Sequence, residues 1–317
     1  MQPDSTTQPD HPPRPRGPKW LAGIIIGDAV VAVFFGIGAL LLKKYGSLGM
    51  LGLPSFLLLP AFGGLIASYI WKSLNPTIGA TCLNSLWMSL LALAIGTLAF
   101  REGLICLLIL FPLFYVSVLA GALAGRLFFK TYPTRFNLSV LPLLILAILG
   151  EPLTRARHEG VVTEQLLIRA PADKVWPQLT SFPDIANPPR FWLFKIGLPF
   201  PVSTTANGDF VNAERRCIFS HNAIFKERVA EFIPGNRLTF DIVESPPDPE
   251  LVGHITPRRG QFLLSANSDG TTTLIGSTWY TLHVRPVWYF DLWTRYIFRS
   301  VHLRVMDDIR RRAEAAT

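Results

Sequence analysis

Residues 286–315 read PVWYFDLWTRYIFRSVHLRVMDDIRRRAEA, and this stretch decides the predicted fold. It opens with a cluster of aromatic residues and continues as a regular amphipathic helix. One face repeats mostly apolar residues at steps of three and four: Val301, His302, Val305, Met306, Ile309 and Ala313. The opposite face collects charged residues: Arg304, Asp307, Asp308, Arg311 and Arg312. A helix this long with one wide apolar stripe needs a surface to pack against, so we expect a sheet beside it.

The residues before this helix predict a curved antiparallel sheet. Residues 161–169 are expected to form its first strand, followed by a turn and a short helix that ends near Leu179. Alternating apolar and polar residues separated by turn residues predict further strands at 210–220, 223–233, 237–244, 261–267 and 271–285. Residues 190–202 and 245–260 are predicted to be loops. The first loop is rich in aromatic residues, so we expect it to cover something, enter a pocket or touch a bilayer.

The first half of the chain has the pattern of a multi-pass membrane protein. Apolar runs at 20–42, 50–71, 81–100 and 103–127 are long enough to cross a bilayer, and charged residues lie at their ends. A fifth run, 138–150, reaches a spanning length only if it is extended, so four and five transmembrane helices both remain open. Residues 1–19 are predicted to be a disordered tail with a basic flank. The charges flanking the runs leave the side of the C-terminal region undetermined.

Composition supports this division of the 317 residues. Half of the chain is apolar, 16% is charged, and the mean hydropathy is +0.34. The net charge of +8 divides into +6 for residues 1–150 (10 basic, 4 acidic) and +2 for the remainder (20 basic, 18 acidic). Basic residues at the ends of apolar runs are ordinary in membrane proteins, so nucleic-acid binding is not indicated. The three cysteines have no metal-binding spacing and are expected to be buried, inert thiols; neither a metal nor another cofactor is expected.

Three short motifs carry a resemblance to a known superfamily. They are IRAPADKVW at 168–176, FKERV at 225–229 and PGNRLTF at 234–240. With the order of elements, they resemble the START-like superfamily of helix-grip domains, in which a curved antiparallel sheet wraps a long C-terminal helix and which includes polyketide cyclases. The resemblance covers about residues 160–315. We therefore predict a transmembrane region at 20–153, a linker at 154–160 and a helix-grip domain at 161–317.

The resemblance implies a cavity between the sheet and the helix, suited to an apolar ligand. Seven aromatic residues are candidates to line it: Trp192, Phe194, Phe219, Phe225, Tyr280, Trp293 and Tyr296. The alternative is that they simply fill the core. Glu227 and His302 are weak candidates for a general acid or base. The sequence does not fix which way Glu227 faces; an exposed strand face for Glu227 and a hydrogen-bonded helix edge for His302 are the alternatives.

Asp28 is the only acidic residue deep in the first apolar run. An ionisable group at that depth suggests a proton or ion site or an interhelical contact; the alternatives are a position near the end of a tilted helix and a hydrogen bond to a neighbouring Ser or Thr.

Three functions follow as hypotheses. The first is binding of a hydrophobic small molecule or lipid by a domain tethered to the cell membrane. The second is an enzyme of the cyclase, dehydrase or hydrolase kind acting on a polyketide-like or aromatic substrate. The third is transport or signalling by the membrane helices, with the C-terminal domain as a ligand sensor.

Overall fold

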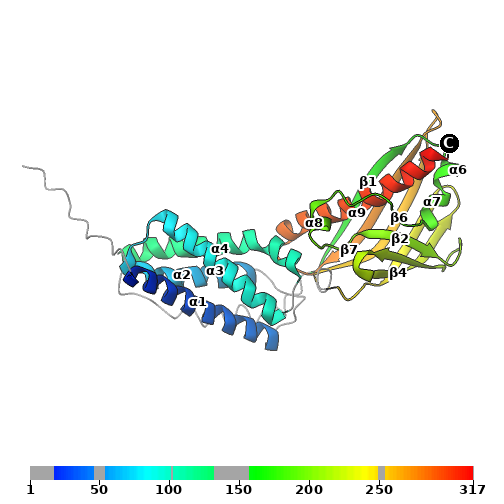
Figure 1. The fold of residues 1–317 in the computed structure, drawn as a ribbon. Helices are drawn as coiled ribbons and strands as arrows, with labels where there is room; N and C mark the ends of the chain where they lie inside the picture. Colours follow the sequence, from blue (N-terminus) through cyan, green and yellow to red (C-terminus); the bar gives the residue numbers. More distant parts are fainter. Residues whose placement is uncertain (1–17, 46–53, 101–102, 132–156, 249–253, 317) are drawn as a thin grey trace, which may run out of the picture.

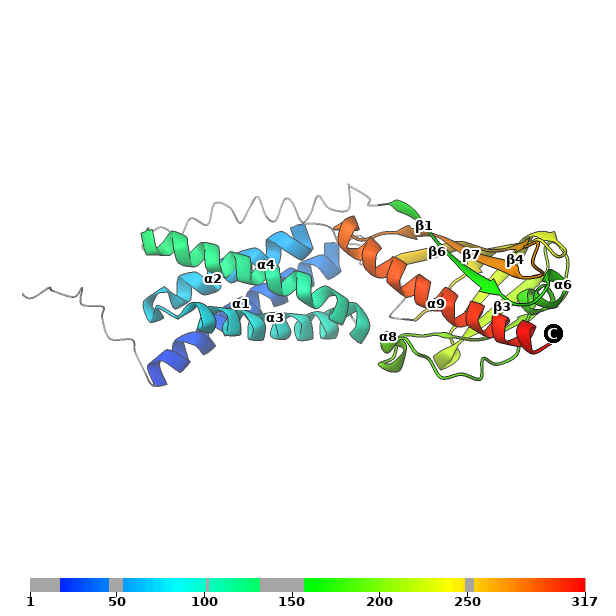
Figure 2. The same ribbon diagram turned by 90° about the horizontal axis from the view of Figure 1, so that it is seen from above.

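The computed structural model describes residues 18–45, 54–100, 103–131, 157–248 and 254–316. It contains an N-terminal group of helices and a C-terminal sheet wrapped against one long helix (Figures 1 and 2). Most of the predicted tail, the predicted fifth apolar run and the first part of the predicted linker lie outside the described residues.

The described part of the N-terminal region contains four α-helices: α1 (Pro18–Tyr45), α2 (Leu59–Trp71), α3 (Ile78–Phe100) and α4 (Leu104–Thr131). A π-helical turn, Pro54–Leu58, leads into α2, and a 3₁₀ turn, Lys72–Leu74, follows it. Three of these helical segments are long and apolar enough to cross a membrane by length and composition: Phe56–Leu74, Ile78–Thr97 and Leu104–Thr131. In α1 the described apolar stretch is shorter, Ala22–Ile37.

Glycine allows α2 and α4 to touch through their backbones. A Cβ atom on Gly64 would lie 2.0 Å from the carbonyl oxygen of Val118, and a Cβ atom on Gly121 would lie 1.8 Å from that of Ala61. Any larger residue at either position would force the helices apart. This is the small-residue packing that associates helices in the absence of a hydrophobic driving force.

The C-terminal region is a seven-stranded antiparallel sheet in the order β1-β7-β6-β5-β4-β3-β2. The strands are β1 (His158–Ile168), β2 (Pro201–Ala206), β3 (Glu214–Phe219), β4 (Ile224–Ile233), β5 (Arg237–Glu244), β6 (Ile255–Ala266) and β7 (Thr272–Leu282). Three short helices precede β2: α6 (Ala172–Val175), α7 (Pro177–Thr180) and α8 (Trp192–Lys195). The last helix, α9 (Val287–Ala315), crosses the concave face of the sheet (Figure 2). The predicted architecture of a curved sheet around a long C-terminal helix is confirmed.

Two predicted loops contain regular structure. Residues 190–202 include α8 and the start of β2, and residues 245–260 include the first half of β6. A proline argues against a strand because it lacks an N–H group, yet Pro257 lies within β6. The pairing of β6 with β5 ends at Arg259, so Pro257 is paired only with β7 and sits beside a register shift. The missing donor is therefore tolerated at this partly unpaired edge.

The predicted apolar stripe of α9 is buried against the sheet, except that Val301 is only half-buried. A Cβ atom on Gly276 of β7 would lie 3.0 Å from Sδ of Met306, which shows how closely α9 approaches the sheet. The prediction that Asp308 lies on the exposed face is wrong. Asp308 is buried, and its carboxylate pairs with Arg311 at 2.9 Å and Arg312 at 2.6 Å. These basic partners come from the next helical turn, which is why a buried acid is tolerated there.

Candidate ligand-binding cavity

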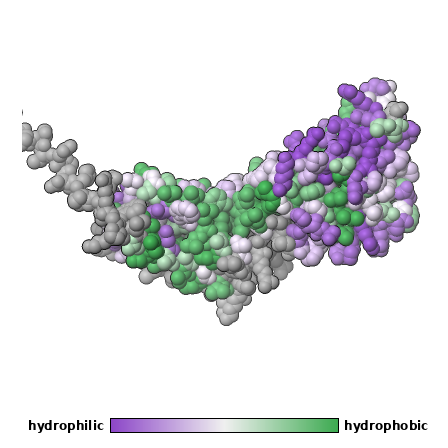
Figure 3. Space-filling view, viewed as in Figure 1, coloured by the Kyte–Doolittle hydropathy of each residue, from purple (hydrophilic) through white to green (hydrophobic). Residues whose placement is uncertain are grey.

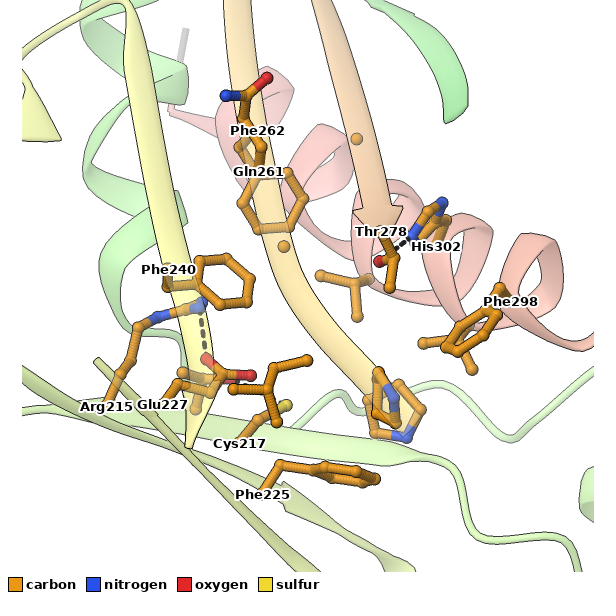
Figure 4. Close-up of a pocket in the computed structure, with 18 of the residues that line it drawn as sticks. Arg215, Cys217, Phe225, Glu227, Phe240, Gln261, Phe262, Thr278, Phe298 and His302 are labelled. Atoms are coloured by element: carbon orange, nitrogen blue, oxygen red, sulfur yellow. Dashed lines mark hydrogen bonds and ion pairs between the residues drawn. The ribbon is translucent and has the colours of Figure 1, made fainter. Parts of the chain in front are cut away.

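A cavity of about 110 Å³ lies between the concave face of the sheet and α9 (Figure 4). Its wall is mostly aromatic and aliphatic, with six phenylalanines: Phe182, Phe219, Phe225, Phe240, Phe262 and Phe298. The cavity is smaller than the roughly 150 Å³ of an apolar cavity that holds benzene, so with the side chains in these positions it suits only a small apolar group, such as a branched alkyl group.

Glycine helps to create this space. Gly260 of β6 and Gly276 of β7 both line the cavity. A Cβ atom on Gly260 would lie 2.4 Å from the ring of Phe240, so even alanine at this position would displace that ring. The cavity therefore depends on the absence of side chains at specific points of the sheet, and not only on the curvature of the strands.

A buried ion pair forms one side of the cavity. Arg215 of β3 and Glu227 of β4 are direct cross-strand partners, are 2% and 6% exposed, and approach to 2.7 Å. The other two nitrogens of the guanidinium also donate: Nε donates to the carbonyl of Thr180 at 2.8 Å, and Nη2 donates to that of Leu179 at 3.1 Å. The same group stacks on the ring of Phe240, 4.3 Å from its centroid. Arg215 thus joins α7, the sheet and the cavity wall.

Glu227 faces inward, which the sequence left open. Phe225, Glu227 and Val229 alternate with exposed residues along β4 and are all buried. Burial raises the pKa of the Glu227 carboxyl, and the charge of Arg215 opposes that rise. One carboxylate oxygen accepts the bond from Arg215; Figure 4 shows the other turned toward the interior of the cavity.

Cys217 and His302 are the other titratable side chains with notable surroundings. Burial raises the pKa of the Cys217 thiol to about 12, so it is protonated at neutral pH. All three cysteines are half-buried, less enclosed than predicted.

His302 of α9 lines the cavity opposite Glu227 (Figure 4), and its Nε2 atom lies 2.7 Å from the hydroxyl of Thr278. Burial lowers the pKa of His302 to about 4, which makes the imidazole neutral at physiological pH.

The predicted aromatic residues separate into two groups. Phe219 and Phe225 line the cavity and pack together with ring centroids 4.8 Å apart. The other five lie outside its wall: Phe194 and Trp293 pack toward the helical region, Trp192 and Tyr296 are exposed, and Tyr280 is fully buried in a cluster of the C-terminal region. The role of any of the seven in binding stays a prediction.

Tyr280 shows why a buried aromatic residue need not reach the cavity. Its ring stacks on Phe298 with centroids 5.3 Å apart, and its hydroxyl donates a hydrogen bond to Asp291. Phe298 therefore stands between Tyr280 and the open space. The sequence contains no sign of this order, because both residues belong to aromatic-rich segments.

A second apolar cluster joins the two regions of the molecule. Its buried members are Ile105 and Ile109 of α4 with Leu193, Phe194 and Leu198 around α8. The first half of α9 packs against these residues through Tyr289, Phe290, Trp293, Ile297 and Val301. Val301 belongs both to this cluster and to the cavity wall. The apolar surface of α4 is thus continuous with the interior of the sheet.

Asp28 lies far from this cavity, in α1. Its Oδ1 atom is buried and has no hydrogen-bond partner in the described parts of the chain, and the same holds for Trp71 Nε1, Asn84 Nδ2 and Ser85 Oγ. Gly27 lies directly against the indole of Trp71, since a Cβ atom there would be 2.4 Å from Nε1. A hydrogen bond from a neighbouring Ser or Thr to Asp28, one of the alternatives considered for this residue, is not formed among the described residues. Its functional role stays a prediction.

Residues that the sequence did not single out complete the cavity. They include Arg215, Cys217, Phe240, Gln261, Phe262 and Phe298. For Phe240 the signal was present, because Leu238, Phe240 and Ile242 alternate with polar residues in the strand predicted at 237–244. For Arg215 no local signal exists, since its inward direction follows from its pairing with Glu227. Within the part of the chain that the structure describes, no group of three His, Cys, Asp or Glu residues could hold a metal ion.

Comparisons with solved structures fall on the C-terminal half, which matches structures of the norcoclaurine synthase kind. Norcoclaurine synthase from Thalictrum flavum, in complex with dopamine and hydroxybenzaldehyde, is 14% identical, and the match covers 49% of this chain and 87% of that one with a TM-score of 0.34. A protein from Thermus thermophilus is 14% identical over 50% of this chain and 99% of that one, with a TM-score of 0.36. A protein from Nitrosospira multiformis is 19% identical over 47% and 93%, with a TM-score of 0.32. No protein-family model and no curated protein matches the chain in sequence. Likenesses of this degree decide nothing about activity.

Proposed function

We propose that the protein is a membrane-anchored binding protein that holds a hydrophobic small molecule or lipid in the cavity between the sheet and α9. The observation that carries this proposal is the continuity of apolar surface through Val301, which joins the cavity wall to the cluster formed with α4. A ligand taken from a bilayer would meet apolar surface along this route.

The polar groups of the cavity wall support an apolar ligand. Arg215 is bonded to Glu227 and to two main-chain carbonyls, and His302 is bonded to Thr278. Gln261 donates to the hydroxyl of Thr239 at 3.0 Å. Most of these groups are bonded within the wall, although Nδ1 of His302 is buried and has no partner among the described residues, so a ligand needs few matching polar groups to offset their desolvation. A hydrocarbon or aromatic body with at most one polar end fits this wall best.

The helical region is the proposed anchor. Its three long apolar helices have the length and composition of membrane spans, and its outer surface is hydrophobic in Figure 3, whereas the C-terminal region is largely hydrophilic. The finer prediction of a multi-pass protein of the cell membrane, with four or five spans, is part of this proposal. The membrane would then act as the reservoir from which the ligand is drawn.

Native mass spectrometry of the full-length protein, released from its membrane in mild detergent, tests the proposal. We expect a retained apolar mass on the wild-type protein and its loss in Phe225→Trp, which places a larger ring in the cavity. Phe210→Trp is the matched control, because Phe210 is an exposed phenylalanine of the same region. Equal retention by both variants, or no retained mass on any of the three proteins, would contradict the proposal.

An enzyme of the cyclase or hydrolase kind is the second candidate, and one observation favours it. Glu227 and His302 face the same cavity from opposite walls, which gives one acid and one neutral imidazole access to a single bound molecule (Figure 4). Glu227→Gln keeps the shape of the side chain while it removes the carboxylate. If the protein is an enzyme, this variant will still retain the apolar mass but will no longer convert it. If binding alone is the function, wild type and variant will release the same unaltered compound.

A further inference from the structure

The first half of α9 exposes an unusual apolar face. Trp288, Leu292 and Tyr296 follow one another at four-residue steps and therefore lie on one side of the helix. Trp288 is 71% exposed, Leu292 is 66% exposed and Tyr296 is 44% exposed. A helix face turned toward water normally carries charged residues, so three large apolar side chains in succession indicate contact with something other than water.

Helix α8 extends this face. The ring of Phe191 packs edge-on against Tyr296 and also contacts Trp192, with centroid distances of 4.9 Å and 6.3 Å. Trp192 and Ile196 are themselves exposed. The five exposed residues Trp192, Ile196, Trp288, Leu292 and Tyr296 form one patch, here called the junction surface.

The inner side of the same segment is fixed to the helical region. Tyr289 donates a hydrogen bond to the carbonyl oxygen of Ile109 in α4, and the rings of Phe56 and Phe290 lie 5.6 Å apart. On α4 itself, Leu104 is exposed next to the buried Ile105. Hydrophobic surface in Figure 3 runs along the helical region up to this junction. The junction surface is therefore a continuation of the apolar exterior of the helices.

Charge marks where the apolar face ends. Arg295 is exposed one residue before Tyr296 and Arg299 three residues after it, and they pair with Asp291 at 2.7 Å and with Glu164 at 3.6 Å. Lys195 at the end of α8 is also exposed. From Trp288 to Tyr296 the helix rises by about 12 Å along its axis. The apolar face of an interfacial helix enters the headgroup and acyl boundary by about 5–10 Å, and Trp and Tyr side chains are enriched at that level.

We propose that the junction surface lies in the headgroup and upper acyl layer of the bilayer that the N-terminal helices cross. This inference rests on the membrane placement in the proposed function. It adds that α8 and the first half of α9 are immersed in the lipid interface, while the arginines mark the level of the headgroups. The Val301 end of the cavity then opens beside lipid, so an apolar ligand need not pass through water to reach it.

Quenching by brominated lipids tests the position of Leu292. In a full-length background with Cys82, Cys106 and Cys217 replaced by alanine, a single cysteine is placed at Leu292, Val116 or Leu167 and labelled with bimane. All three positions are exposed, so the substitutions disturb little packing: Val116 lies in the middle of α4, and Leu167 lies near the end of β1, away from the junction. Each protein is reconstituted into phosphatidylcholine vesicles brominated at a shallow or a deep acyl position.

We expect shallow bromine to quench the label at Leu292→Cys about threefold more than the label at Leu167→Cys, and deep bromine to quench Val116→Cys best. If Leu292→Cys and Leu167→Cys are quenched equally while Val116→Cys is quenched strongly, the junction surface is not in lipid, and the membrane placement stands without it. If Val116→Cys is not quenched, the membrane placement itself fails and the inference fails with it.

Discussion

The two halves of α9 have opposite surroundings, although they belong to one continuous helix. The second half, residues 302–315, packs Val305, Met306 and Ile309 into the core of the sheet. Its arginines are used for structure: Arg304 donates to the carbonyl of Pro201 at 2.8 Å and Arg312 donates to that of Pro183 at 3.0 Å. This half behaves like a helix of an ordinary soluble domain.

The first half, residues 287–301, has an apolar face on each side. One side packs against Ile105 and Ile109 of α4, and the other exposes Trp288 and Leu292. The difference teaches that α9 is both the central helix of the C-terminal domain and its connection to the helical region. Because Val301 marks the transition and lines the cavity, the proposed binding site lies where one environment gives way to the other.

The largest effect is expected from Arg215→Met, which removes the cation of the buried pair. Glu227 would then be left as an uncompensated buried acid, and loss of one partner of a buried ion pair costs about 3–5 kcal/mol. Pulse proteolysis in urea, applied to the full-length protein, reports the free energy of unfolding of the C-terminal region. The double variant Arg215→Met with Glu227→Met serves as the control and should recover most of the loss. A single variant as stable as wild type would show that the pair is not part of the folded core.

A smaller effect is expected from Met306→Ala, which directly compares the halves of α9. Met306 is fully buried against Gly276, and truncation of a buried methionine destabilises by about 2–5 kcal/mol. Leu292→Ala in the exposed first half is the matched variant and should change the unfolding free energy in detergent by less than about 0.5 kcal/mol. The same proteolysis measurement applies to both. Similar losses for the two variants would remove the distinction between the halves.

The smallest of the three effects is a pH dependence carried by His302. Its pKa is about 4 in the folded protein against an ordinary 6.5, so the stability that depends on the neutral imidazole is complete above about pH 6.5 and is lost as the pH falls toward 4. Between pH 7 and pH 5 this amounts to about 2 kcal/mol. His302→Gln cannot titrate, so the unfolding free energy of this variant should fall less over that range. Because burial and nearby positive charge also lower the pKa of His283, the difference between wild type and variant isolates His302. If the unfolding free energies of wild type and His302→Gln change in parallel with pH, His302 is not the source of the pH dependence.

The sequence was informative where a periodic pattern extends over many residues. The repeat from Val301 to Ala313 predicted the second half of α9, and the alternation at 237–244 predicted β5 to the residue. It failed where the outcome depends on residues that are distant in the chain. Glu227 faces inward because Phe225 and Val229, on the same face of β4, pack toward the interior, and Pro257 is tolerated in β6 because the pairing of β6 with β5 ends at Arg259.

In the candidate site, too, local sequence patterns were informative and contacts between distant residues were not. Phe225 could be named because it lies in a motif of the C-terminal region, whereas the packing of Phe194 and Trp293 beside α4 could not be foreseen. The sequence contains no sign that Ile105 and Ile109 would meet them, since nothing local in an apolar run indicates which residues face another domain. The contact between the helical region and the C-terminal region decides which of these residues pack beside α4.

Photocrosslinking from inside the cavity tests the central claim most directly. p-Azidophenylalanine in place of Phe262, a buried cavity residue, and in place of Phe210, an exposed phenylalanine, gives two full-length proteins with the same reactive group in opposite surroundings. After irradiation in the native membrane, mass spectrometry of the purified proteins identifies any covalent adduct. The account predicts a discrete apolar adduct at position 262 and none of that mass at position 210. Irradiated proteins that carry no adduct at 262, or the same adduct at both positions, would contradict it.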